Sequence, residues 1–433
     1  MAEGDVTEKY RLTLASVYLD SNLRDAIIDF NKQSAEYRIE YLDYSGYNTE
    51  DNDYSGGYTQ LNYDIISGSV PDMICMDQLP VSTYAARGIL ADLGAMMEAD
   101  GGFNTEDYLM NVLAAGTYQG RQVTVIPLFS VMTLVGNADY VGTGDSWTIE
   151  DMQALMAQYP DASLFEDTWT RDGLLYWFSV TAMSDYIDTE TSRCSFSSPS
   201  FVAFLELLGQ FPEEIDWEAF SLRYEDPNYW ETYDSQYREG RVLLEPYTLS
   251  NISSDVRELL SAFGGSFNPI GFPSDSGSGG SCIIPQMEIG IAASSKLQDV
   301  CWEFLKYLLS ENFQSGANWS LPVKRSVLDQ QVEDALPSPY GEDYLADMQL
   351  YMDADSISAE SLENDFYAKN LTREQFAPVL RLLERVTVVR RDWTEIVNII
   401  SEEAATYFAG QKTAQAAAEI IQSRAQIYIS ENS

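Results

Sequence analysis

Strand-like and helix-like patterns alternate along the first part of the chain. Residues 10–15 have the pattern of a strand, and apolar side chains between residues 23 and 30 recur at helical spacing. Residues 38–44 return to the β-branched and aromatic composition of a strand. Pro71 then precedes an apolar run at residues 73–76, which is typical of a buried parallel strand. This alternation predicts an α/β fold with a mainly parallel sheet, helices on both faces and ligands at the carboxyl ends of the strands.

Helical patterns dominate the rest of the chain. Thr148 is placed to cap one helix, and Ser198 opens another in which Pro199 takes the first position. Residues 271–281 are rich in Gly and Ser and are the most loop-like segment. A strand and a strongly amphipathic helix follow, and the C-terminal part is predicted to be wholly helical.

The charge balance narrows the choice of partners. The 433 residues include 25 Lys and Arg against 68 Asp and Glu, for a net charge of −43. Such a surface repels nucleic-acid backbones and anionic headgroups, so neither nucleic acid nor direct membrane-surface binding is expected, and a soluble monomer is favoured. The most acidic short stretch, residues 48–53, lacks the glycine and the closing glutamate of a calcium loop.

Two residue types limit the possible chemistry. The chain has no histidine, which excludes Ser–His–Asp and Cys–His catalysis and every His-ligated metal site. The four cysteines, Cys75, Cys194, Cys282 and Cys301, form no Cys-x-x-Cys pair, so zinc and thioredoxin-like chemistry are unsupported. We expect buried free thiols at Cys75 and Cys301, and neither a cofactor nor a metal.

The sequence also bears on location. No run of 18 apolar residues exists that could span a membrane. The first five residues are polar and lack a signal-peptide core, so either the protein is cytoplasmic or a leader has been removed. Composition leaves both alternatives open.

Four segments carry motifs in a fixed order. The first, residues 64–93, contains Pro71-Asp72-Met73-Ile74 and Tyr84-Ala85-Ala86-Arg87-Gly88-Ile89-Leu90. The others are Phe196-Ser197-Ser198-Pro199-Ser200-Phe201, Gly240-Arg241-Val242-Leu243-Leu244, and a series of shorter matches between residues 270 and 324. In order and spacing these segments resemble family 1 extracellular solute-binding proteins, and together they cover most of the chain.

The resemblance implies a two-lobed periplasmic-binding-protein fold of type II, each lobe a mainly parallel sheet flanked by helices, with the ligand in the cleft between the lobes. Residues 1–137 plus 282–325 would form lobe 1, and residues 138–281 plus 326–433 the more helical lobe 2. It also implies an extracytoplasmic lipoprotein whose leader and anchoring cysteine are missing from this chain. Its function would be to capture a sugar or oligosaccharide by hinge closure and deliver it to the permease of a bacterial ABC importer, without catalysis.

A sugar offers hydroxyls that need polar partners and ring faces that stack on aromatic side chains. Glu245-Pro246-Tyr247 and the residues up to Asn251 resemble a segment of the family's maltose-binding members in which an aromatic residue stacks on the sugar. We expect Tyr247, just beyond a strand at residues 242–244, to be either that platform or a core residue, and we include Glu245 from the same segment.

Further candidates follow from position. Asp77 and Gln78 come directly after the strand at residues 73–76 and could accept sugar hydroxyls, or Asp77 could simply begin a helix. The aromatic candidates, each with a core or surface alternative, are Tyr47, Trp169, Trp177, Trp230 and Trp319. Trp302 and Trp393 lie on amphipathic helices and are expected in the core.

A secreted glycoside hydrolase is the main alternative from another class, because it too could be acidic, aromatic-rich and independent of histidine. With 68 acidic residues, no catalytic carboxylate pair can be identified from the sequence. A purely structural surface protein would not need polar loops at strand ends. The ordered motifs favour the binding protein over both.

Overall fold

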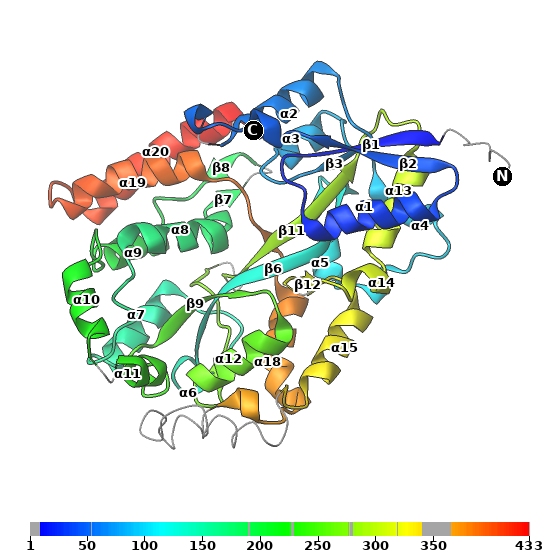
Figure 1. The fold of residues 1–433 in the computed structure, drawn as a ribbon. Coiled ribbons are helices and arrows are strands. Elements are labelled where there is room, and N and C mark those ends of the chain that lie inside the picture. Colours follow the sequence, from blue (N-terminus) through cyan, green and yellow to red (C-terminus); the bar gives the residue numbers. More distant parts are fainter. Residues whose placement is uncertain are drawn as a thin grey trace. The chain divides into compact units, whose positions relative to one another are not determined.

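A computed structural model describes residues 9–52, 54–188, 191–226, 229–275, 277, 280–317, 319–339 and 365–432. The chain forms two compact units, one of Met1–Ser130 and Pro285–Gln330 and the other of Val131–Ile284 and Gln331–Ser433, here called unit 1 and unit 2. The chain passes from one unit to the other within β6 (Thr124–Asn137), β11 (Cys282–Ile291) and α15 (Arg325–Ala335) (Figure 1). The division of the chain after residues 137, 281 and 325 stays a prediction.

Unit 1 contains the predicted parallel strands. β1 (Tyr10–Ser16) pairs in parallel with β2 (Tyr37–Asp43) on one side and with β3 (Met73–Cys75) on the other. α1 (Ser21–Gln33) connects β1 to β2, and Asp20 caps it by accepting hydrogen bonds from the backbone N–H groups of Asn22 and Leu23. Because the three strands are parallel, the loops that follow them leave the same edge of the sheet.

The other elements of unit 1 have the following bounds. They are α2 (Gly56–Ser67), α3 (Val81–Ala86), α4 (Leu93–Ala99), α5 (Met110–Ala114), β4 (Thr117–Tyr118), β5 (Arg121–Gln122), α13 (Gln298–Leu308), α14 (Glu311–Gln314) and β12 (Leu321–Pro322).

The sheet is mixed, which corrects the expectation of a mainly parallel sheet in each lobe. β11 runs antiparallel to β3, with Ile289 opposite Cys75. In unit 2, β9 (Leu244–Leu249) and β10 (Phe267–Asn268) both pair antiparallel with β6. The sequence of such strands shows apolar runs, but nothing in these runs indicates the direction of the strand. The antiparallel pairing was therefore not foreseen.

Unit 2 is rich in helices, as predicted. Its other elements are α6 (Ala138–Val141), α7 (Ile149–Gln158), α8 (Arg171–Thr181), β7 (Ile187–Asp188), β8 (Arg193–Cys194), α9 (Pro199–Leu208), α10 (Trp217–Tyr224), α11 (Tyr229–Ser235), α12 (Ile252–Ala262), α18 (Arg373–Arg385), β13 (Val388–Val389), α19 (Thr394–Phe408) and α20 (Ala414–Asn432). The short strand β13 pairs with β11, so the C-terminal part is not wholly helical.

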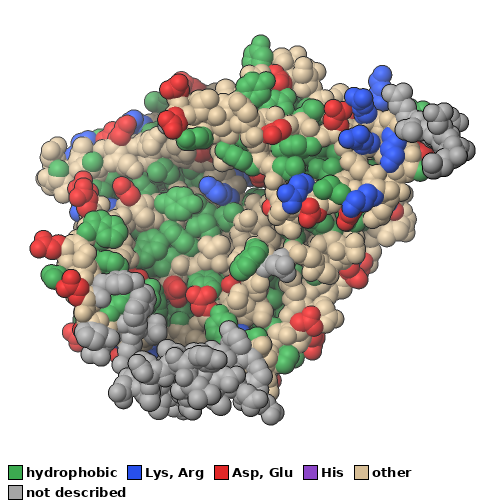
Figure 2. All heavy atoms as spheres, viewed as in Figure 1, with side chains coloured by type: hydrophobic (Ala, Val, Ile, Leu, Met, Phe, Trp, Pro, Cys, Tyr) green, Lys and Arg blue, Asp and Glu red, His purple; other side chains and the backbone are tan. Residues whose placement is uncertain are grey.

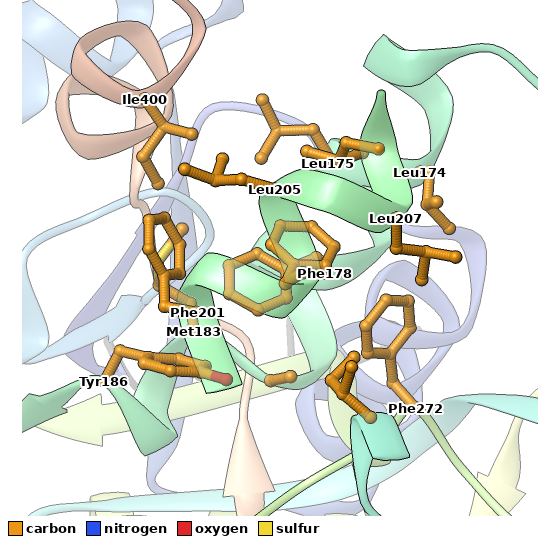
Figure 3. Packing of buried hydrophobic residues seen from close by; sticks show 14 of the residues in the cluster. Leu174, Leu175, Phe178, Met183, Tyr186, Phe201, Leu205, Leu207, Phe272 and Ile400 are labelled. Carbon is orange, nitrogen blue, oxygen red and sulfur yellow. The ribbon is translucent and has the colours of Figure 1, made fainter. Parts of the chain in front are cut away.

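An aromatic core holds the helices of unit 2 together (Figure 3). The rings of Phe178 on α8 and Phe204 on α9 stack with centroids 3.9 Å apart, and Phe272 meets both rings edge-on. The predicted start of α9 is confirmed, because the Ser198 hydroxyl accepts a hydrogen bond from the backbone N–H of Phe201 and Pro199 opens the helix. The side of α8 that carries Phe178 is therefore held in place by its contacts with Phe204 and Phe272.

The cysteines are free thiols, with Cys75, Cys282 and Cys301 buried and Cys194 half-buried, which confirms the expectation for Cys75 and Cys301. Trp302 is buried as expected, and Trp393 packs against the core of unit 2 while half-buried. None of the helices that the structure describes has the length and apolar character needed to cross a membrane.

Thiol reactivity should follow this burial. Burial raises the pKa of the Cys75, Cys194 and Cys301 thiols and limits access to them, so we expect slow labelling of the native protein by Ellman's reagent, fastest at Cys194. In guanidinium chloride all four thiols should react quickly. Cys194→Ser should abolish the fastest native phase, whereas labelling of Cys75 at the same rate as Cys194 in the native protein would contradict this packing.

Candidate ligand-binding site

The loops after the parallel strands of unit 1 carry three of the predicted residues. Asp77 and Gln78 follow β3 and are exposed, and Gln78 has a left-handed φ of 53°. Tyr47 follows β2, is 52% exposed, and its ring lies 5.9 Å from that of Tyr44. These side chains belong to loops at one edge of the sheet, where polar and aromatic groups would meet a ligand.

Strand β1 adds residues to this edge that sequence reasoning missed. Although Asp77 has exposed surface, the surrounding protein partly desolvates its carboxyl group and raises its pKa, and the charge of Asp20, in the loop after β1, raises it further. Tyr18 in the same loop accepts a hydrogen bond from Asn48 Nδ2 at 2.8 Å, and its ring meets that of Tyr58 edge-on at 6.3 Å. The strand-end argument used for residues 77 and 78 would have identified Tyr18 and Asp20 had it been applied to the first strand.

Glu288 on β11 was also missed, because a single acid inside an apolar strand carries no recognisable pattern. Its Oε1 atom accepts a hydrogen bond from the Thr124 hydroxyl at 2.6 Å. Burial, aided by Asp77, raises the pKa of Glu288 to about 7. Trp319, also in unit 1, is 81% exposed and lies just before β12.

In unit 2, Glu245 and Tyr247 lie on one face of β9, opposite Val135 and Thr133 of β6. The predicted place of Tyr247 beyond a strand is wrong, because the strand extends through Pro246 to Leu249. The Tyr247 side chain is only 9% exposed, which favours the core alternative for its ring.

The hydroxyl of Tyr247 reaches helix α12. It donates a hydrogen bond to Glu258 Oε2 at 2.8 Å and lies 3.5 Å from Asp255 Oδ1. Asp255 is held in place because its Oδ2 atom accepts backbone N–H groups of Ser250 at 2.6 Å and Asn251 at 2.8 Å. Two carboxylates of α12 are therefore positioned beside β9.

A further carboxylate arrives from a distant segment. The chain after residue 162 runs beside the start of β9: the backbone N–H of Ser163 donates to Arg241 O at 2.8 Å, and that of Leu244 donates to Leu164 O at 3.0 Å. Glu166 follows directly, and its Oε1 atom accepts 2.8 Å hydrogen bonds from the Tyr237 hydroxyl and from Gln236 Nε2. Glu166, Glu245, Asp255 and Glu258 are here called the carboxylate cluster.

Glu245 is the unusual member of the carboxylate cluster. Its Oε2 atom is buried and has no hydrogen-bond partner among the residues that the structure describes. Burial, followed by the charges of Glu258 and Glu166, raises the pKa of Glu245 to about 8. The same carboxylates raise the pKa of Tyr237 and Tyr247, with burial again the main cause. A carboxyl group with this pKa is mostly protonated at neutral pH.

Aromatic side chains lie next to the carboxylate cluster along the chain. The backbone N–H of Trp169 donates to Glu166 O at 3.0 Å, and the Trp169 ring meets that of Trp177 on α8 edge-on, with centroids 6.0 Å apart. Both tryptophans are half-buried. Figure 2 shows hydrophobic side chains gathered over α8 and acidic side chains near β9. Trp230 belongs to α11, but its side chain lies outside the described part of the chain.

The family model for bacterial extracellular solute-binding proteins matches residues 26–326. The chain belongs to the bacterial extracellular solute-binding protein family. The family predicted from the ordered motifs is thereby confirmed. No curated protein matches the chain.

Solved structures show that this solute-binding protein has the two-lobed fold expected for it. A family 1 extracellular solute-binding protein from Alicyclobacillus acidocaldarius has 16% identity and a TM-score of 0.56, covering 98% of this chain and 100% of that one. The cyclic alpha-maltosyl-1,6-maltose binding protein from Arthrobacter globiformis has 15% identity and a TM-score of 0.55, with coverage of 98% and 100%. The sugar-binding protein MalE from Xanthomonas citri has 14% identity and a TM-score of 0.55, covering 98% of each chain.

The solute-binding protein thus offers two sets of polar and aromatic groups. One is the strand-end edge of unit 1, and the other is the carboxylate cluster of unit 2 with Trp169 and Trp177. Among the described residues, no three carboxylate or cysteine side chains are arranged to hold a metal ion. Hydrogen-bond acceptors beside aromatic rings suit an organic ligand with several donor groups.

Proposed function

We propose that this chain is the extracytoplasmic carbohydrate-binding component of a bacterial ABC importer. It captures a sugar or oligosaccharide by hinge closure and passes it unchanged to the permease. The observation that carries the proposal is the match to the solute-binding family, in a chain where Glu166 of the carboxylate cluster lies three residues before Trp169, whose ring meets that of Trp177. The structural neighbours named for a maltosyl ligand and for sugar binding support it through their shared fold. A monomer held at the cell surface by a lipid anchor is part of the same proposal.

The proposed ligand contacts divide between the units. In unit 1 they are Asp77, Gln78, Tyr47 and Trp319, and in unit 2 they are Glu245, Trp169, Trp177, Trp230 and Tyr247. Carboxylate and amide groups would accept hydrogen bonds from sugar hydroxyls, while indole and phenol rings would cover the apolar faces of the sugar. The ring of Tyr247 is largely buried, so Tyr247 is included because its hydroxyl donates a hydrogen bond to Glu258 of the carboxylate cluster.

A thermal-shift screen over mono- and oligosaccharides tests the proposal. A ligand at 100 times its dissociation constant adds about 2.7 kcal/mol to the free energy of unfolding. For a chain of this length that corresponds to a rise in melting temperature of about 3 °C if it unfolds in one step. If no carbohydrate raises the melting temperature, the proposed function is wrong.

Hydrolysis of the bound carbohydrate is the alternative function, and it is tested on the carbohydrates that the screen identifies. A protonated Glu245 beside ionised carboxylates is an arrangement that glycoside hydrolases use for acid catalysis. We propose that no turnover occurs, because an importer needs its cargo intact. Release of more reducing ends than protein molecules, lost in Glu245→Gln, would favour the hydrolase.

Replacing Trp169 tests the aromatic platform. We expect Trp169→Ala to weaken binding of the carbohydrate found in the screen by about 5- to 150-fold, because a stacked aromatic ring contributes roughly 1–3 kcal/mol. Isothermal titration calorimetry measures the affinity, and melting of the unliganded variant measures the loss of packing. Trp217→Ala is the control, because Trp217 on α10 in the same unit is 63% exposed. Unchanged affinity with a lower melting temperature would make Trp169 a core residue.

A further inference from the structure

One buried oxygen of the carboxylate cluster has no hydrogen-bond partner among the residues that the structure describes. Glu166 accepts from Tyr237 and Gln236, Glu258 accepts from Tyr247, and Asp255 accepts from two backbone N–H groups. Glu245 Oε2 is buried in the same cluster and accepts no hydrogen bond from any described residue. A buried carboxylate oxygen without a donor costs free energy, so its presence points to a donor that arrives with the ligand.

Three arginines near the cluster donate to groups outside it; Arg238, next to Tyr237, donates through Nη1 to Ser261 O at 3.4 Å. Arg241, just before β9, donates through Nε to Glu239 at 2.8 Å and through Nη2 to Thr232 O at 2.7 Å. Arg257, on the helix that carries Asp255 and Glu258, donates to four backbone carbonyls. No ion pair among the described residues includes a member of the carboxylate cluster.

The groups that act on Glu245 are therefore all acidic or phenolic. Glu166 and Glu258 raise its pKa, and Glu245 in turn raises that of Tyr233, Tyr237 and Tyr247. Among the described residues, no three His, Cys, Asp or Glu side chains are grouped so that they could hold a metal ion. An ammonium group fits better, since it brings a positive charge together with three N–H donors.

We propose that the ligand of this protein is a glycan that bears a protonated primary amine, and that its ammonium group binds Glu245 within the carboxylate cluster. This inference rests on the proposed carbohydrate-binding function and specifies the class of carbohydrate. On binding, Glu245 releases its proton to solvent and its carboxylate accepts a hydrogen bond from the ammonium, which faces Glu166 and Glu258. Trp169 and Trp177 are available to the sugar ring. A neutral hydroxyl at the same position supplies one donor and leaves the acidic groups uncompensated.

Sugars that differ at one position test the inference. Isothermal titration calorimetry would compare glucosamine and galactosamine, and their β-1,4-linked oligomers up to the tetramer, with the N-acetylated and the hydroxyl counterparts of each. We expect the amine form to bind at least tenfold more tightly than both counterparts. If a neutral counterpart binds as tightly as the amine, the inference is overturned and the proposed function stands.

A non-sugar diamine, putrescine, separates the two proposals. If putrescine binds and no sugar of any form does, the proposed function fails while the cation site stands. If neither putrescine nor any amine-bearing sugar binds, the inference fails, whatever other carbohydrate is found in the thermal screen.

Matched variants locate the contact. Glu245→Gln should weaken binding of the amine sugar by about 10- to 150-fold, the range expected for a hydrogen bond to a charged group, and should weaken binding of the hydroxyl counterpart much less. Glu206→Gln is the control, because Glu206 is an exposed acid on α9 of the same unit. Melting curves of both variants check the fold. Equal affinities for the wild type and Glu245→Gln would remove Glu245 from the site.

Discussion

Arg257→Met should lower the free energy of unfolding by about 3–5 kcal/mol, because it leaves several buried backbone carbonyls without their charged donor. The Arg257 side chain is 1% exposed. Its Nη1 atom donates to Phe366 O at 2.5 Å and Lys369 O at 2.8 Å, and its Nη2 atom donates to Ala335 O at 2.5 Å and Pro337 O at 2.7 Å. Methionine fills similar space but leaves these carbonyls without their donors.

Urea titration followed by tryptophan fluorescence measures this loss. Arg381→Met provides the control, because Arg381 is exposed on α18 and its replacement should change the free energy of unfolding by less than about 0.5 kcal/mol. Should Arg257→Met match the control, the carbonyl contacts would have no role in stability.

Glu245 should make the unliganded protein less stable as the pH rises. Its pKa is about 8 in the folded protein, against about 4.3 in an unfolded chain. The folded state therefore binds the extra proton between these values, so the free energy of unfolding falls between about pH 4.5 and 8 and is level above that. The loss attributable to Glu245 is about 3–5 kcal/mol on the scale of 1.36 kcal/mol for each pKa unit.

Glu245→Gln should remove this part of the pH dependence. The variant should unfold at similar urea concentrations to the wild type at pH 5 and should be clearly more stable at pH 8.5. Glu288, whose pKa is raised to about 7, contributes a similar slope from unit 1 that persists in the variant. Urea titrations at pH 5, 7 and 8.5 measure the difference. Parallel pH profiles for the two proteins would show that Glu245 is ionised without penalty in the fold.

The local elements could be predicted because their causes are local. Period, composition and capping residues identify β1, α1, β2 and the start of α9, and each depends on residues within a few positions of one another. Strand direction depends on distant partners, which explains why the antiparallel direction of β9 and β11 was not foreseen.

Tyr247 shows how one boundary changes an interpretation. Glu245 and Pro246 look like the end of a strand, because both residue types are uncommon in strands. Pro246 instead lies within β9 opposite Leu134, in a strand that pairs with β6 and, among the described residues, with no other strand. The strand therefore continues, and the aromatic residue expected in a loop is covered.

The carboxylate cluster could be predicted only in part. Glu245 was included through its neighbourhood in the chain, but Glu166 reaches it through backbone pairing of residues 163–164 with residues 241–244. Glu258 and Asp255 enter through a helix that the sequence presents as an ordinary amphipathic one. None of these contacts produces a recognisable sequence pattern at the residues involved, because each contact results from tertiary packing.

The three passages of the chain between the units determine the order in which the protein can be completed. Unit 1 needs Pro285–Gln330, and unit 2 needs Gln331–Ser433, so neither is continuous in the sequence. During synthesis, an emerging chain that has passed residue 284 still lacks part of both units. Unit 1 is therefore completed at residue 330 and unit 2 only at residue 433, so most of the chain has been made before either unit can fold in full.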